Sequence, residues 1–311
     1  MNRERGGLPL FQKTGGIQIV RKIIPYVFLL PFLIIVTVFY LLPAVFNIYI
    51  SLTDMDSALE GKFIGLENFR IMFSMEADPV MPQVVLNTIL FVAFSLILTL
   101  GLGLLIALLT HDMKGFWRNF FRVIWFIPRT TPPVVWGFLW VWAFDPSKYG
   151  LMNMLMRSLG LGTKSWLSQY PLLIVILANG ILGVPYAMTI LGASLETIPT
   201  SIIEASQIDG ANWFQTTFYI KIPLLKWPLA FLTIWYSLSF LTSFQYIYII
   251  TKGGPFYDST TLALYAYKKA FMHMDLGYGA ALSIILILIS LVTVIVLWKK
   301  FYLGALSREG A

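Results

Sequence analysis

The sequence predicts an all-α integral membrane protein with six transmembrane helices. Of its 311 residues, 58% are hydrophobic and only 12% are charged, and the mean hydropathy of +0.77 lies far above that of soluble globular domains. Stretches without a charged residue cover 23–50, 83–109, 171–195, 228–250 and 278–298, and a sixth apolar stretch, 123–144, carries Arg129 alone. Each is long enough for the roughly 20 residues that a membrane-spanning helix needs.

The first stretch is predicted to be a retained span. It follows Arg21 and Lys22, as a signal peptide would, but its 28 uncharged residues exceed the apolar region of a signal peptide and no small-residue cleavage site follows. Its prolines, Pro25, Pro31 and Pro43, predict kinks, which membrane bundles tolerate when neighbouring groups satisfy the freed carbonyls.

The distribution of basic residues predicts that both termini are cytoplasmic. With that orientation, the inner segments hold thirteen lysines and arginines and the longer outer segments hold eight. The expected organisation is a cytoplasmic segment at 1–22, a six-helix domain at 23–303 with a cytoplasmic loop at 196–227, and a cytoplasmic tail at 304–311. The net charge of +7 then indicates contact with anionic lipid and not with nucleic acid.

The residues that usually carry catalysis or hold metals do not form a pattern in this sequence. There is no cysteine, and the two histidines, His111 and His273, fall on opposite sides of the predicted membrane. Asp54 and Asp56 resemble the Asp-x-Asp metal pair of sugar-nucleotide enzymes, but they lie in a predicted outer loop, where nucleotide donors are absent. The GLGTKS stretch at 160–165 has Thr163 where a phosphate-binding loop needs glycine. We therefore expect no catalytic residue, no metal site and no ATP site in this chain.

The polar stretch EASQIDGANWFQTTFYIKIPLL, at 204–225, predicts a helical hairpin on the cytoplasmic side. Helical spacing covers 201–208, and Gly210 follows Asp209 where a helix can end in a left-handed residue. A second helix is expected at 211–220, ending before Pro223 because the proline ring disfavours helix in the preceding residue. A hairpin that only connects two spans would have the same pattern.

This stretch resembles the cytoplasmic signature of the transmembrane subunits of bacterial ATP-binding-cassette (ABC) importers. That signature is Glu-Ala-Ala, three residues, Gly, nine residues and Ile-x-Leu-Pro. The matching positions here are Glu204, Ala205, Ser206, Gly210, Ile220, Ile222 and Pro223. Ser206 replaces the second alanine, Ile222 replaces leucine, and one residue is added before Pro228.

Further stretches are similar to carbohydrate importers of the maltose and glycerol-phosphate type. They are GLENF at 65–69, NT at 87–88, TIP at 197–199, DGA at 209–211 and TKGGPFYDSTTL at 251–262, in the family's order. The resemblance covers 25–303 and is greater to the first of the two permeases that such importers pair. It implies the type I ABC importer permease fold, in which the hairpin is a coupling helix that fits a groove of the ATPase.

The resemblance also implies roles and partners. Glu204 would pair with a basic group of the ATPase, Ala205 and Ser206 would permit close approach, Asp209 would cap or dock, and Gly210 would form the turn, although turn formation alone also explains Asp209 and Gly210. The implied partners are a second homologous permease, a pair of ATPase subunits carrying ATP and Mg²⁺, an extracytoplasmic binding protein that docks on 51–82 and 144–170, a sugar or oligosaccharide, and lipids of a bacterial or archaeal cytoplasmic membrane.

Substrate contacts are expected where polar groups lie within spans, because such groups are costly unless they face a cavity or a partner. Arg129 lies among Pro128, Pro132 and Pro133, which predict a broken helix beside the transport path. Its guanidinium suits a carboxylate or phosphate, so the substrate can be acidic or phosphorylated. The alternative is that Arg129 caps carbonyls at the break.

Two stripes at helical spacing complete the expected substrate site. Asn179, Gly183 and Tyr186 share one face of the fourth span, as in the family's sugar-facing stripe, and Tyr236, Phe240 and Ser243 repeat the spacing in the fifth. Aromatic faces and hydroxyls suit sugars, but small and hydroxylated residues also mediate ordinary helix packing.

The sequence therefore predicts a permease subunit that imports a carbohydrate and is not itself an enzyme. A secondary transporter driven by an ion gradient is one alternative, but no inverted repeat or intramembrane carboxylate supports it. A membrane enzyme acting on lipid-linked sugars is another, but it would need an acidic or histidine cluster near one membrane face. The residues do not specify which sugar is carried.

Overall fold

The computed structural model describes residues 14–309, with side chains described for 25–301. Within this range the regular secondary structure is helical apart from one antiparallel bridge between Thr53 and Phe63, as expected for an all-α protein. Residues 1–13 of the expected segment 1–22, and the last two residues of the expected tail 304–311, lie outside the described range. The rest of both segments is helical, because α1 begins at Thr14 and α16 extends to Glu309.

Three of the helical elements in the described range are π-helical. In chain order they are α1 (Thr14–Val36), η1 (Thr37–Leu41), α2 (Leu42–Ser51), α3 (Glu67–Phe73), α4 (Met81–His111), α5 (Phe116–Thr130), α6 (Pro133–Ala143), α7 (Leu151–Ser158), α8 (Trp166–Gln169), α9 (Pro171–Glu196), α10 (Thr200–Ile208), α11 (Trp213–Thr216), η2 (Thr217–Lys221), α12 (Ile222–Leu224), α13 (Lys226–Leu241), α14 (Gln245–Thr251), α15 (Leu262–Tyr267), η3 (Lys268–Met272) and α16 (Leu276–Glu309).

Four helical segments among the described residues are long and apolar enough to cross a membrane unaided. They are Pro25–Ser51, Met81–His111, Pro171–Glu196 and Leu276–Phe301. A fifth crossing is possible if Trp213–Leu224 and Lys226–Leu241, which meet at an angle of 65°, count as one. Helix length therefore gives four or five crossings and does not by itself confirm the expected six.

The two remaining predicted spans are interrupted in the structure. The stretch 123–144 is divided between α5, which ends at Thr130, and α6, which begins at Pro133. The stretch 228–250 is divided between α13, which ends at Leu241, and α14, which begins at Gln245. Each half is too short to span the hydrocarbon layer alone.

Proline accounts for the break between α5 and α6. Thr131 precedes Pro132 and has an extended backbone (ψ 130°), as expected for a residue before proline. The carbonyl of Ile127 instead accepts hydrogen bonds from the hydroxyls of Thr130 and Thr131, at 3.0 and 2.9 Å. Side chains thus replace the backbone donors that the helix loses in an apolar setting.

Two other prolines are accommodated without a break, each just after a π-helical turn. The N–H of Leu42 donates to the Thr37 carbonyl, five residues back, and Pro43 follows. Ile222 donates in the same way to Thr217, and Pro223 follows. Because the hydrogen-bond register has already shifted, a residue without an N–H is tolerated there. The expectation that the second hairpin helix ends before Pro223 is therefore wrong, since the helical path continues to Leu224.

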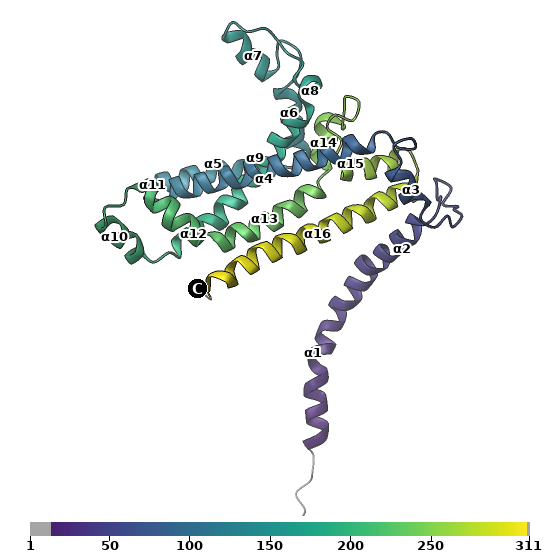
Figure 1. Cartoon of the computed structure of the whole chain (residues 1–311), viewed down its shortest axis with the longest axis horizontal. Helices are drawn as coiled ribbons and strands as arrows, with labels where there is room; N and C mark the ends of the chain where they lie inside the picture. The colour runs from purple at the N-terminus through teal and green to yellow at the C-terminus, as the bar shows by residue number, and fades with distance from the viewer. Residues whose placement is uncertain (1–13, 310–311) are drawn as a thin grey trace, which may run out of the picture.

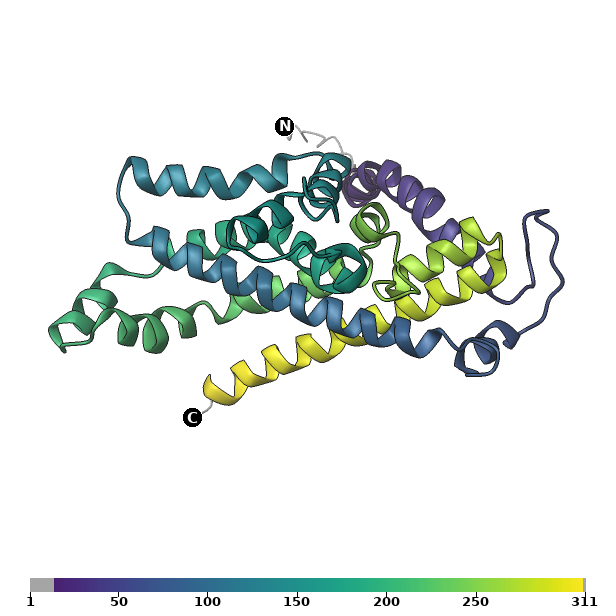
Figure 2. The ribbon, with the colours of Figure 1, turned by 90° about the horizontal axis from the view of Figure 1, so that it is seen from above.

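The core of the bundle is the contact between α4 and α9, which run side by side, with α13 packed against both (Figures 1 and 2). Small residues permit the close approach. A Cβ added to Gly103 would lie 2.6 Å from the Cβ of Ala187, and one added to Gly180 would lie 2.5 Å from a methyl of Leu98. Such contacts between small residues are typical of membrane helices, where van der Waals packing drives association.

The bundle has two distinct ends. The hairpin of α10 to α12 lies at one end, toward which the C-terminal end of α16 also points, and α3 lies at the other (Figures 1 and 2). α7 projects from the bundle, and α1 leaves it and extends away (Figure 1). We call these the hairpin end and the α3 end.

Buried amides and a buried carboxylate organise the loops around α3 and α7. Asn68 donates to the carbonyls of Ser51 and Thr53, and Asp78, 5% exposed, accepts hydrogen bonds from the hydroxyls of Tyr265 and Tyr278. The fully buried Asn153 lies 3.0–3.2 Å from the carbonyls of Asp145, Pro146, Ser147 and Lys164 and accepts from Lys164 and Trp166. These loops are therefore fixed by specific polar contacts.

We predict that Gly103→Ala destabilises the fold and that Gly101→Ala does not. The new methyl at 103 would lie within contact distance of Ala187 and Met188, and overpacking of this kind costs about 1–3 kcal/mol. Gly101 lies on the same helix with no atom within 4 Å of the added Cβ, so alanine there adds helix propensity, worth about 1 kcal/mol. Each detergent-solubilised variant is heated, and the temperature at which half of the protein is no longer monodisperse is measured. Equal midpoint temperatures for Gly103→Ala and Gly101→Ala would contradict the packing argument.

Candidate functional site

The first arm of the hairpin ends in a glycine turn. Asp209 is the C-cap residue of α10, and Gly210 follows with φ +80°. The N–H of Gly210 donates to the Gln207 carbonyl (3.0 Å) and the N–H of Ala211 to the Ser206 carbonyl (2.9 Å), which is the Schellman arrangement. Since no atom lies within 4 Å of a Cβ added at 210, the left-handed backbone is the reason for glycine.

The second arm starts with a reciprocal cap. The side chain of Asn212 accepts from the N–H of Gln215, whose own side chain accepts from the N–H of Asn212. The hydroxyls of Ser206 and Thr216, 3.2 Å apart, join the two arms. The predicted order of helix, turn and helix is thus present, although the second helix begins at Trp213 and not at Ala211.

The residues predicted to contact an ATPase are mostly exposed. Glu204, Ala205, Asp209, Gly210 and Pro223 lie on the surface of the hairpin. Among the described residues, the carboxylates of Glu204 and Asp209 have no hydrogen-bond or ion-pair partner. Ser206 differs, because it is 7% exposed and its hydroxyl is engaged within the hairpin.

The hairpin also exposes large apolar side chains. Ile208 is 86% exposed and Tyr219 is 79% exposed, and Phe214 and Phe218 also lie on the surface of the hairpin. Exposed apolar side chains on the same element as two carboxylates without partners are typical of a protein interface.

A cluster centred on Asp112 attaches the hairpin to the bundle and was not predicted. Lys221 Nζ lies 3.0 Å from Asp112 Oδ1, Trp213 Nε1 donates to Oδ2 at 2.9 Å, and His111 Nδ1 lies 3.0 Å from Oδ1. Burial raises the pKa of Asp112, but the hydrogen bonds from His111, Trp213 and Lys221, with the lysine charge, outweigh it and lower the pKa to about 2. One signal was available: Asp112 is the only acidic residue between the second and third predicted spans.

A second charged cluster joins α5 to the end of α9. Glu196, the last residue of α9, lies 3.6 Å from Arg118 Nη1 and 3.2 Å from Arg122 Nη2. Arg118 also donates to the carbonyls of Met113 and His111, beside Asp112. The ends of α4, α5 and α9 are therefore linked by charged side chains near the hairpin.

Arg129 lies in the last turn of α5, and its side chain is exposed. Within the described part of the chain its guanidinium makes no hydrogen bond or ion pair. The alternative that Arg129 caps the carbonyls at the helix break is wrong in this structure, because Thr130 and Thr131 take that role.

Four of the other predicted substrate residues are buried between helices. Tyr236 donates to the Gly183 carbonyl at 2.6 Å, and its ring stacks on Phe240, which in turn packs edge-on against Phe91. Asn179, Tyr236 and Phe240 are each 4% exposed, and a Cβ added at Gly183 would lie 2.7 Å from Thr99. Their contacts in this chain are helix packing, the alternative that the sequence left open.

Ser243 and Tyr186 are only half-buried. The expectation that Ser243 continues the helical face of Tyr236 and Phe240 is wrong, because α13 ends at Leu241 and Ser243 lies in the break before α14. From there its hydroxyl donates to Asn179 Oδ1 at 3.1 Å. Ser239 and Thr242, which the sequence did not single out, and Gln245 are exposed around the same break.

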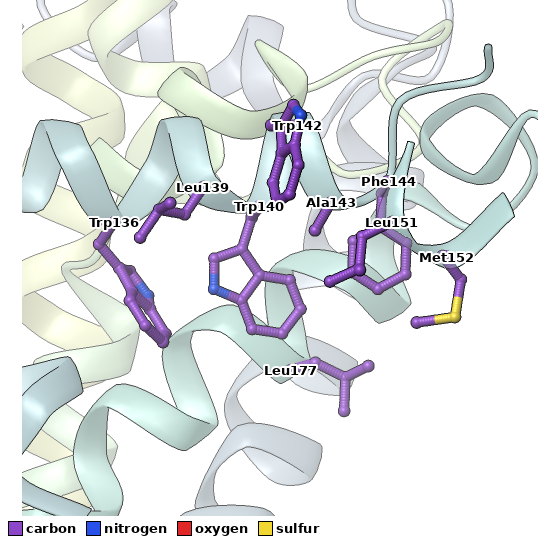
Figure 3. Close-up of a pocket in the computed structure, with 9 residues that line it drawn as sticks. All are labelled: Trp136, Leu139, Trp140, Trp142, Ala143, Phe144, Leu151, Met152 and Leu177. Atoms are coloured by element: carbon purple, nitrogen blue, oxygen red, sulfur yellow. The ribbon is translucent and has the colours of Figure 1, made fainter. Parts of the chain in front are cut away.

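An apolar groove of about 470 Å³ lies beside α6 (Figure 3). Trp136, Trp140 and Phe144 line one side, with Leu177 of α9 across from them (Figure 3). The Trp136 indole N–H is already bonded to the Ala178 carbonyl at 3.1 Å, and no charged residue lines the groove. Its chemistry suits the tryptophan-rich belt at a membrane interface and not recognition of a sugar.

The described residues contain no group of three or more histidine and acidic side chains that could hold a metal ion. What the structure offers instead is an exposed acidic hairpin, broken helices and an unpaired arginine beside one break. Together with four or five apolar crossings, these features are typical of the membrane subunit of a transport system.

Comparison with known proteins agrees with this class. Residues 99–302 match the family described as "Binding-protein-dependent transport system inner membrane component". The chain is 32% identical over 290 residues to the probable ABC transporter permease protein YurN of Bacillus subtilis (strain 168), covering 91% of this chain and 97% of that protein. It is 31% identical over 272 residues to the sn-glycerol-3-phosphate transport system permease protein UgpA of Agrobacterium fabrum, covering 86% and 91%.

A solved structure shares the fold. A chain in the crystal structure of a bacterial alginate ABC transporter, in complex with its alginate pentasaccharide-bound periplasmic protein, superposes with a TM-score of 0.81 at 21% identity, covering 91% of this chain and 96% of that chain. The present chain belongs to the family of inner membrane components of binding-protein-dependent transport systems. The predictions that it is an ABC importer permease and a transport subunit, not an enzyme, are confirmed by this membership.

We predict that the Asp112 carboxylate titrates near pH 2. Because its pKa in the folded chain lies below the usual 3.8, the ion pair stabilises the junction fully above pH 3.8 and is lost as the pH falls through about 2. The ¹³C carboxyl resonance that disappears in Asp112→Asn reports this titration. Lys221→Met should raise the midpoint, since a hydrogen bond and a positive charge are removed. A midpoint at or above 3.8 in the unmodified protein would contradict the assigned contacts.

Proposed function

We propose that this permease imports an anionic carbohydrate, with a second homologous permease, a pair of ATPase subunits that carry ATP and Mg²⁺, and a binding protein that delivers the substrate. The observation that carries the proposal is the hairpin. It presents Glu204 and Asp209 without partners in the described chain, around a glycine turn that is fixed by backbone hydrogen bonds. Such a free acidic and apolar surface suits a groove with basic residues on a soluble ATPase.

The proposed topology has six crossings, two of them broken. The pair α5 and α6 and the pair α13 and α14 each serve as one span, and irregular backbone within a membrane is tolerated where it lines a protein cavity or a path. The hairpin and both termini face the cytoplasm, in keeping with the bias of basic residues, as parts of the proposed divisions 1–22, 23–303 and 304–311. The outer segments 51–82 and 144–170 then face the binding protein.

Arg129 supports the choice of an anionic substrate. A guanidinium in an apolar span is costly unless it faces water, a partner or an anion, and the described chain supplies no counter-ion for it. Tyr186 and Ser243 are half-buried candidates for hydroxyl contacts of the sugar, whereas Asn179, Gly183, Tyr236 and Phe240 would shape the site from behind.

The names of similar proteins point in the same direction. UgpA belongs to a transport system for sn-glycerol-3-phosphate, and the solved transporters import the acidic polysaccharide alginate. Both substrates carry negative charge, which a free arginine would recognise by paired, charge-assisted hydrogen bonds.

Glu204→Lys is expected to prevent copurification with the ATPase subunit, because the reversed charge would face basic residues in the docking groove. Affinity purification from membranes, with the ATPase recognised by its nucleotide-binding peptides in mass spectrometry, measures this. Glu60→Lys is the matched control, since it makes the same charge change in an exposed loop at the α3 end. If Glu204→Lys retained both the ATPase and substrate uptake, the hairpin would not be the docking element.

Arg129→Ala is expected to lower the uptake of an anionic substrate at least about tenfold, because a hydrogen bond to a charged group is worth about 1.5–3 kcal/mol. Uptake of labelled glycerol 3-phosphate, an alginate oligosaccharide and maltose is compared in cells that express the complete system. Arg129→Lys keeps the charge and should retain part of the uptake. Equal losses for anionic and neutral substrates would show that Arg129 serves the structure and not the recognition of charge.

A further inference from the structure

One carboxylate accepts the side-chain hydrogen bonds that join the hairpin to the rest of the bundle. Among the described residues, every side-chain hydrogen bond from 200–224 to a residue outside the hairpin ends on Asp112, and the donors are Trp213 and Lys221. Trp213 is the first residue of α11, and Lys221 is the last residue of η2. Asp112 therefore holds the second arm at its first residue and again at the end of its π-helical turn, and Ser206 and Thr216 hold the first arm to the second.

Lys221 makes this attachment difficult to open. The residue is 3% exposed, and an ammonium group removed from water is strongly destabilising unless a counter-ion and hydrogen bonds replace the water. Asp112 provides both, at 3.0 and 3.4 Å from Nζ. Separating the hairpin from α4 would leave this charge without its partner until water reached it.

Asp112 is also well placed to pass on a displacement. It directly follows α4, an uninterrupted helix of 31 residues and therefore about 46 Å long, which packs along α9 through Gly103 and Gly180. A continuous helix is one of the rigid elements that carry coupling between distant sites. α4 therefore provides a path from Asp112 to the centre of the bundle.

We infer that Asp112 and Lys221 are positioning residues that make the hairpin and α4 move as one body, so that a displacement imposed on the hairpin reaches the transport path. The inference rests on the proposed function, because an ATPase bound at the hairpin must supply that displacement. It assigns to Asp112, which lies outside the resemblance to the family signature, the transmission of movement between the hairpin and α4.

The absence of cysteine from the sequence allows a direct test. Cysteines introduced at Ile97, on the exposed side of α4, and at Tyr219, on the exposed side of η2, carry spin labels. The distance between them is measured by pulsed electron paramagnetic resonance in the purified complex with its ATPase, without nucleotide and after trapping with Mg-ATP and orthovanadate. We expect one narrow distribution that nucleotide does not change.

Asp112→Asn and Lys221→Met should broaden this distribution and make it shift on trapping. Asp112→Glu, which keeps the charge, should restore most of the narrow distribution. Lys114→Met is the matched control, because it removes a positive charge from an exposed side chain two residues beyond Asp112. A second labelled pair within the hairpin, at Gln207 and Tyr219, should stay unchanged in every variant, whereas simple unfolding of the hairpin would broaden both pairs.

Three results would count against the inference. A narrow, nucleotide-independent Ile97 to Tyr219 distance in Asp112→Asn and Lys221→Met, with the ATPase still bound, would overturn it and leave the proposed function intact. Broadening of the distance distributions of both labelled pairs would show that Asp112 and Lys221 only stabilise the hairpin locally. Failure of the unmodified chain to purify with an ATPase would overturn the proposed function and this inference together.

Discussion

The ion pair between Asp112 and Lys221 is the contact on which the arrangement of the hairpin end depends. Lys221 in the hairpin is 3% exposed and requires a counter-ion, and Asp112 at the end of α4 provides one because the hairpin folds back against it. Trp213 and His111 add hydrogen bonds to the same carboxylate, and Arg118, Arg122 and Glu196 tie the neighbouring ends of α5 and α9. The exposed acidic and apolar face of the hairpin is presented from this fixed base.

The same requirement, that buried polar groups be satisfied, shapes the interrupted helices. At the break after α5, the hydroxyls of Thr130 and Thr131 satisfy the Ile127 carbonyl, and at the break after α13, Ser243 bonds to Asn179. These bonds leave Arg129 without a structural task in the described chain. A broken span whose backbone is satisfied by side chains, with a guanidinium that has no partner in the described chain beside it, is the feature on which the proposed transport of an anion rests.

Sequence reasoning succeeded where local rules decide the structure. Charge-free stretches identified α4, α9 and the crossing part of α16, and Gly210 marked the turn because only a left-handed residue closes a Schellman motif there without strain. It failed where distant residues decide. No local sequence pattern shows that Lys221 forms an ion pair with Asp112, or that the Tyr236 hydroxyl donates to the Gly183 carbonyl. The π-helical turn just before Pro223 also has no sequence signal of its own.

The central claim is that the hairpin end is the contact surface for a soluble ATPase, and site-specific photo-crosslinking tests it most directly. A benzophenone amino acid replaces Ile208, which is 86% exposed at the hairpin tip, and, as the control, Leu159, which is 75% exposed in the segment after α7. After irradiation of intact membranes, the account predicts that position 208 is joined to a subunit with nucleotide-binding motifs and that position 159 is not. Crosslinks from 208 only to lipid or to the binding protein would contradict the account.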